Sequence, residues 1–150
     1  MDTKDIEAEA ATLVLDSFTE ATALRLGKIL VDLALADALP VVINIRTADR
    51  TLFHAALPGS APLNDLWARR KSNTALAFQL PSLLVGLRNK AKAEGLDRHG
   101  LPPGDYADSG GAVPVRVKGV GMVAVATVSG LPQVEDHKLV VRGLKALIAG

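Results

Sequence analysis

The sequence predicts a mixed α/β fold in which helices cover an antiparallel sheet of about five strands. Two pairs of segments rich in β-branched residues are each joined by a tight turn, which is typical of β-hairpins. Helical segments precede, separate and follow these pairs, and one further strand stands alone. Neither hairpin can be the crossover that joins parallel strands, so the order of segments disfavours a parallel Rossmann sheet.

The first part of the chain predicts two helices around a short strand. Residues 3–11 are expected to form a short helix, and residues 12–15 the lone strand. A long helix is expected over residues 19–37, with Ser17 or Thr19 as its N-cap. Apolar residues cover so much of this helix that we expect it to be buried on more than one side.

The strands of the two hairpins follow from their β-branched residues and turns. Residues 41–46 and 51–56 are separated by a polar turn at residues 47–50 and predict the first hairpin. Residues 113–118 and 122–129 flank a turn that contains glycine and predict the second. In both hairpins the two strands are expected to pair antiparallel to each other.

Two helices and a long loop are predicted between the hairpins. Asn64 is a good N-cap for a helix that reaches about Phe78. Pro81 is expected at the first position of a further helix, which ends near residues 94–95. Residues 95–111 are interpreted as a long loop, and loops of this length in a small domain are usually functional or mobile. A final helix is expected after Pro132.

The composition fits one globular domain over residues 1–150 with an aliphatic core, because 49% of the residues are apolar and only 3% are aromatic. The net charge is +1 and no basic tail is present, so we expect no nucleic-acid partner. The absence of cysteine excludes disulfides and zinc–thiolate sites. The acidic N-terminus is unlike a signal peptide, and the apolar stretch 29–39 is too short to cross a bilayer. We therefore expect a soluble, cytoplasmic protein with no membrane partner.

One helix face offers a candidate ligand site. Trp67, Arg70, Lys71 and Thr74 share a face by their i, i+3, i+4, i+7 spacing, and Arg69 adds a third cation nearby. The only tryptophan of the chain, beside these cations, could clamp a flat anion by stacking and charge-assisted hydrogen bonds. The alternative is that Trp67 anchors the core while the cations form a solvated face or subunit contacts.

The glycine pair Gly110-Gly111, at the end of the long loop, is the other part of this candidate site. Glycine lets backbone N–H groups approach a ligand closely. A turn that needs positive φ would explain the pair equally well, and no dinucleotide or Walker fingerprint surrounds it. The sequence shows no set of nucleophile, base and orienting acid, so it leaves open whether the protein is an enzyme.

The three histidines lie on different predicted elements without the spacing of metal ligands, so we expect no metal site. His54 and His137 are the weak candidates for a metal ligand. His54, in the second strand, could instead make a cross-strand or interface hydrogen bond. His137 could instead be a core histidine with one hydrogen bond, since in the final helix it shares a stripe with Val140, Val141, Leu144 and Ile148.

Several segments together resemble one family. They are residues 39–43, 52–59, 64–71, 106–107 with 110–111, and 128–133 with 136–137. In this order they are similar to the short branch of the GlcG-like superfamily, also called the haem-degrading domain. The resemblance implies a profilin-like α/β/α sandwich and a symmetric homo-oligomer. Some relatives bind or degrade haem, and a related domain is fused to cobalamin adenosyltransferases.

The chain departs from this family pattern at the glycine pair, because Ser109 and Val113 stand where a histidine and a phenylalanine are common. Three hypotheses for the function remain. The first is a small-molecule-binding domain that binds or degrades haem, the candidate cofactor, or another planar anionic ligand. The second is a non-enzymatic oligomeric interaction module. The third, by analogy alone, is an accessory to cobalamin metabolism.

Overall fold

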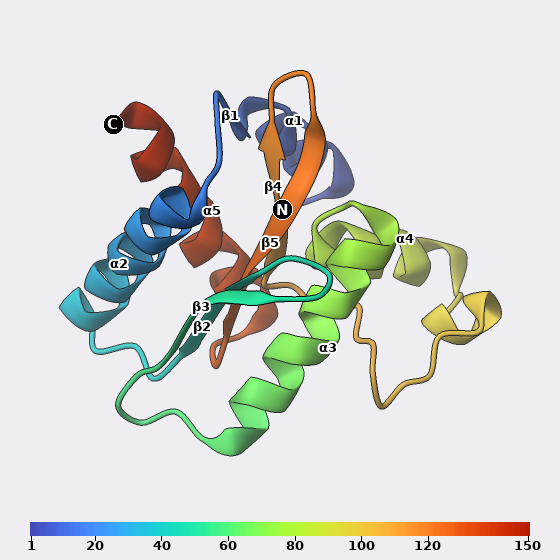
Figure 1. The fold of residues 1–150 in the computed structure, drawn as a ribbon. Helices are drawn as coiled ribbons and strands as arrows, with labels where there is room; N and C mark the ends of the chain where they lie inside the picture. The colour runs from blue at the N-terminus through green and yellow to red at the C-terminus, as the bar shows by residue number, and fades with distance from the viewer.

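The computed structural model describes residues 1–150 as a five-stranded sheet between two layers of helices, with strand order β1-β4-β5-β2-β3 (Figure 1). The helices are α1 (Thr3–Thr12), α2 (Glu20–Ala36), α3 (Pro62–Phe78), α4 (Ser82–Lys92), the 3₁₀ helix η1 (Leu96–His99) and α5 (Gln133–Ala149). The strands are β1 (Val14–Leu15), β2 (Val42–Arg46), β3 (Thr51–Ala56), β4 (Ala112–Val117) and β5 (Gly121–Ser129). The predicted α/β/α sandwich is confirmed.

Both predicted hairpins are present and antiparallel. Strand β2 pairs with β3, β4 pairs with β5, and the two hairpins join through an antiparallel β2–β5 pair. The edge strand β1 differs from the prediction of an antiparallel sheet, because it runs parallel to β4. A hairpin turn forces the chain to reverse, whereas β1 is linked to β4 only through distant segments and is free to run in the same direction.

The main core lies between the sheet and helices α2 and α5, which pack side by side on one face (Figure 1). It is aliphatic, as predicted, with Leu26 and Leu30 of α2 among its fully buried members. The expectation that α2 is buried on more than one side is wrong. Leu24 and Leu35 are 48% and 50% exposed, because α2 forms the outer layer and only one of its faces meets the sheet.

The opposite face of the sheet, covered by α3, is more polar. Alternation along β5 directs Thr127 and Ser129 to this side, and both are buried. Ser72 of α3 lies 2.7 Å from Thr127, hydroxyl to hydroxyl. Small residues of α3, among them Ala68 and Ala75, allow the helix to lie close to the strands. This polar layer positions the candidate site.

Several predicted helix ends are corrected. Thr19 caps α2 as expected, but the N-cap of α3 is Ala61, and Asn64 lies in the first turn, where its side chain accepts a hydrogen bond from the Ala61 N–H at 2.8 Å. Pro81 is the N-cap residue of α4 rather than its first residue. Helix α4 ends at Lys92, before the predicted 94–95, because Ala93 turns into the left-handed conformation with φ 52°. The predicted loop 95–111 contains the short helix η1.

No helix of the chain has the length and apolarity that crossing a membrane would require.

Candidate functional site

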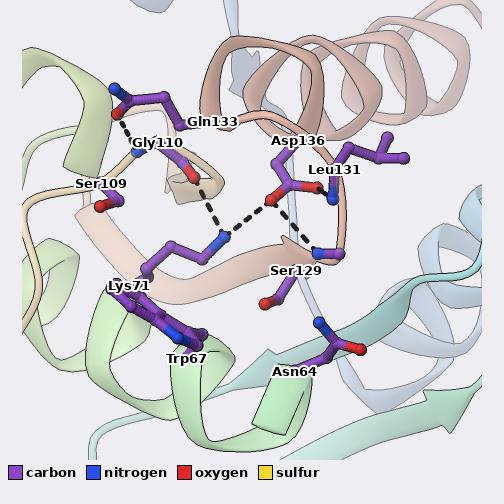
Figure 2. Close-up of a pocket in the computed structure, with 10 residues that line it drawn as sticks. Asn64, Trp67, Lys71, Ser109, Gly110, Ser129, Leu131, Gln133 and Asp136 are labelled. Carbon is purple, nitrogen blue, oxygen red and sulfur yellow. Dashed lines mark hydrogen bonds and ion pairs between the residues drawn. The ribbon is translucent and has the colours of Figure 1, made fainter. Parts of the chain in front are cut away.

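A pocket of about 310 Å³ lies between α3, the turn from β5 into α5, and the end of the loop that precedes β4 (Figure 2). Helix α3 contributes Asn64, Trp67 and Lys71, and the strand end contributes Ser129. Helix α5 begins at Gln133, which also lines the pocket. The pocket therefore joins three segments that are far apart in the sequence.

A buried ion pair forms one wall of this pocket. The Lys71 Nζ lies 3.0 Å from the Asp136 Oδ2, and each of the two side chains is 3% exposed. Lys71 also donates to the carbonyl oxygens of Gly110, at 3.0 Å, and Val128, at 2.8 Å. An ammonium group has three protons, so all of its donors are used. Lys71 is thus neither a solvated cation nor a free anion-binding group.

Asp136, like Lys71, has several hydrogen-bond partners within the protein. It accepts the backbone N–H of Leu131 at 2.9 Å and that of Gly130 at 3.3 Å, and it lies in the positively polarised first turn of α5. Burial lowers the pKa of Lys71 and raises the pKa of Asp136, while the charge of each partner counters both shifts. The pair ties α3 to the loop and to the start of α5.

Trp67 and Arg70 form the second feature of the site. The Arg70 guanidinium lies 4.3 Å from the centre of the Trp67 ring, a cation–π contact, and it donates to the Tyr106 carbonyl at 3.4 Å. Trp67 also borders two neighbouring pockets of about 420 and 390 Å³, both of which Arg70 and Pro103 line as well. The indole therefore lies at the junction of three hollows.

The structure brings some of the predicted site residues together and separates others. Trp67, Arg70 and Gly110 lie at the pockets. Arg69 lines only the outer pocket of about 390 Å³, where it pairs with Asp105 at 2.8 Å and half of its side chain is exposed. Gly111 has φ +136°, which favours glycine, and a side chain there would collide with the Val128 carbonyl and the Lys71 Nζ. The packing of the protein itself therefore explains why this residue is glycine.

None of the histidines lines the three pockets around Trp67. Across the strands, the Asn44 Nδ2 donates to the His54 Nδ1 at 3.0 Å, and the His54 Nε2 lies 2.8 Å from the Asp65 carboxylate. His137 is buried and its Nε2 lies 2.8 Å from Glu9 of α1. Burial lowers the pKa of His137, and Glu9 opposes this shift. No cluster of three potential metal-binding side chains is present in the chain.

Asp136 is the main site residue that the sequence reasoning missed. A signal for the pair was present, because Ala68, Lys71, Ser72 and Ala75 occupy one helical stripe. A lysine within a stripe of small residues indicates a cation directed at the sheet, which needs a buried anion.

Comparison with known proteins decides the family. Residues 18–145 match the family model described as "Haem degrading protein HbpS-like". The chain belongs to this family. The resemblance to the haem-degrading domain is thereby confirmed.

Individual relatives and solved structures are similar to this chain. A UPF0303 protein of Streptomyces coelicolor is 48% identical over 145 residues, which are 96% of this chain and 92% of the relative. The crystal structure of Ybr137w superimposes with a TM-score of 0.89 at 29% identity, over 99% of this chain and 88% of that chain. A PduOC–haem complex has a TM-score of 0.72 at 21% identity, over 88% of this chain and 95% of that chain, and its likeness concerns the fold alone.

Proposed function

We propose that this chain binds a planar, anionic small molecule at the surface around Trp67. The observation that carries the proposal is the Trp67–Arg70 contact at 4.3 Å, at the junction of three pockets. An indole offers a flat apolar surface, and a half-buried guanidinium attracts carboxylates more strongly than a solvated one does. Haem is a planar molecule of this kind, and it is named in the family description and in the PduOC complex.

The residues fit the ring and the carboxylates of haem better than they fit its iron. Leu96, Leu101 and Pro103 add apolar surface beside Trp67 and Arg70. The three pockets have no histidine, methionine or cysteine in their walls, and the Tyr106 phenol is the side chain there of a type that ligates haem iron in other proteins. We therefore propose binding through the ring and the carboxylates and assign no reaction at the iron.

A titration with haemin tests the proposal, followed both by absorbance and by the fluorescence of Trp67, the only tryptophan. Arg70→Ala should raise the haemin Kd roughly tenfold or more, because a charge-assisted hydrogen bond contributes about 1.5–3 kcal/mol. Arg142→Ala, which removes an exposed arginine from α5, is the control of equal charge. Equal haemin affinities for the two variants would refute the proposed site.

We also propose a homo-oligomer, the state in which the alternative function as an interaction module would operate. The edge strand β3 has one side free of any strand partner. Leu63 and Leu66 of α3 are 61% and 58% exposed, and apolar side chains at this exposure favour contacts with another chain. Light scattering should give a mass of at least twice 15.7 kDa at micromolar concentration. A monomer mass would refute this proposal.

A further inference from the structure

Ser129, at the end of β5, is a buried residue whose hydroxyl opens onto the pocket and has no hydrogen-bond partner in the protein. The residue is 2% exposed and lines the pocket between α3 and α5. Figure 2 shows its hydroxyl directed into the space beside Asn64 and Trp67. Ser72 and Thr127, the other hydroxyls buried under α3 near the pocket, bond to each other at 2.7 Å. Polar groups of buried residues normally find a hydrogen-bond partner, so a hydroxyl that lacks one and faces a pocket indicates a position for a ligand atom.

Both amide side chains of the pocket keep a free NH₂ group, but only that of Asn64 is turned toward the Ser129 hydroxyl, while that of Gln133 points away at the other end of the pocket (Figure 2). The Asn64 Oδ1 accepts from the Ala61 N–H at 2.8 Å, and the Gln133 Oε1 accepts from the Gly110 N–H at 2.9 Å. Because the backbone partner is a donor in both cases, the oxygen atoms are fixed and each NH₂ group is left free. The Trp67 indole N–H is a donor as well, so apart from hydroxyl groups the free side-chain groups are all donors.

The charges around the pocket are compatible with a ligand group that accepts hydrogen bonds. The acid and the amine of the Asp136–Lys71 pair cancel each other, and both Asp136 oxygens are already occupied by Lys71 and two backbone N–H groups. Helix α5 starts at Gln133 without a side-chain cap, so the positive end of its dipole lies at the pocket. A small group rich in oxygen acceptors, with a negative charge, matches this arrangement.

We infer that this pocket is a subsite for the carboxylate of a small organic acid. The Ser129 hydroxyl and the free NH₂ group of Asn64 would donate to its oxygens, beside the Trp67 ring. No basic side chain lies within hydrogen-bonding distance of the Ser129 hydroxyl, so its role is to bind and not to attack. The inference deepens the proposed function by naming one group of the ligand, and it rests on that function only because both use Trp67. A small acid without a large ring can test it alone.

The probe is acetate, with acetamide as a neutral molecule of similar shape, titrated at constant ionic strength against the fluorescence of Trp67. Acetate should change the fluorescence saturably, and acetamide should bind at least about tenfold more weakly. An equal response to the two molecules, or no response to either, would overturn the inference.

Two variants assign the binding to the pocket. Ser129→Ala should weaken acetate binding about fivefold. It should leave the melting temperature unchanged, because no group of the protein loses a hydrogen bond when the hydroxyl is removed. Asn64→Asp keeps an acceptor for the Ala61 N–H but replaces the free NH₂ by a carboxylate oxygen, so it should abolish acetate binding. Ser17→Ala and Gln79→Glu, at exposed positions, are the matched controls. Acetate affinities in the pocket variants equal to those in the controls would overturn the inference.

Haemin binding is measured separately in the same proteins. Acetate binding that needs Ser129, together with no haemin binding, would refute the planar-ligand proposal and support the carboxylate subsite. Haemin binding that needs Arg70, together with no acetate binding, would do the reverse.

Discussion

Replacing Lys71 by methionine tests whether the buried ion pair organises the α3 side of the sheet. Methionine keeps most of the length of the side chain but removes the ammonium group. The carbonyls of Gly110 and Val128 lose their side-chain donor, and Asp136 keeps only its backbone N–H partners. The variant therefore isolates the contribution of one charge that is surrounded by protein.

The expected loss is large because the remaining acid stays buried. Breaking a buried pair by removing one partner costs about 3–5 kcal/mol, out of about 5–15 kcal/mol for a whole domain. For a chain of this size each kcal/mol lowers the melting temperature by about 2–4 °C, so we expect a decrease of about 6–20 °C. Lys28→Met, at an exposed position of α2, should change the melting temperature little.

The pH dependence of this variant gives a second test. Without Lys71, burial raises the pKa of Asp136 further above its usual value of 3.8. An acid whose pKa is raised in the folded state stabilises the fold below its unfolded pKa, and this stability is lost as the pH rises through the folded pKa. The difference between Lys71→Met and wild type should therefore be smaller near pH 4 than near pH 8.

Thermal and urea unfolding followed by circular dichroism measure both effects. The double variant Lys71→Met/Asp136→Asn should recover more than half of the loss, because it no longer buries an unpaired charge. A loss below about 1 kcal/mol for the single variant, or an equal loss at both pH values, would refute the structural role that we assign to the pair.

Three further predictions concern other elements. Burial lowers the pKa of His137, so below its usual value of 6.5 the unfolded state binds more protons and stability decreases with falling pH; His137→Gln should flatten the melting temperature between about pH 7 and 5. In Gly86→Ala the new Cβ would collide with the Asp108 carbonyl, so the loop should shift and the free energy of unfolding should decrease by about 1–3 kcal/mol. Calorimetry should detect the loss of stability, and a haemin titration should detect the shift of the loop. Arg69→Ala removes an exposed ion pair with Asp105, so the free energy of unfolding, measured by urea denaturation, should change by no more than about 1 kcal/mol.

Local patterns were sufficient to predict most of the fold. The β-branched run at residues 41–46 and its turn determine a hairpin through neighbouring residues, and the structure has the predicted pairing from Val42 to Arg46. The parallel direction of β1 depends on its partner Arg116, about 100 residues away, which no local pattern encodes. The predicted N-cap of α3 was wrong for a related reason. Asn64 does accept a backbone hydrogen bond with its side chain, but from the Ala61 N–H and from a position inside the first turn of the helix.

The sequence predicts that Trp67 and Arg70 share one helix face, as they do in the structure, but it does not predict the direction of Lys71. Helical spacing correctly brought Trp67 and Arg70 together, since residues three apart share a face. Lys71 lies between that face and the buried stripe of small residues on α3. Its side chain turns toward the sheet because it pairs with Asp136, 65 residues further along the chain. Helical periodicity cannot choose between two adjacent faces when the partner belongs to another element.

The position of the ion pair follows from the different packing of the two layers. On the α2–α5 side a single cluster of 19 buried apolar residues holds the helices, whereas the buried apolar clusters beyond the opposite face have three members each. Helix α3 is therefore held largely by directional contacts, among them Lys71 to Asp136 and Ser72 to Thr127. Directional bonds restrict rotation and sliding of a helix more than aliphatic contacts do, because they are lost over small displacements. Since the helix that they restrict carries Asn64 and Trp67, weakening the pair should reduce ligand affinity even at temperatures where the variant remains folded.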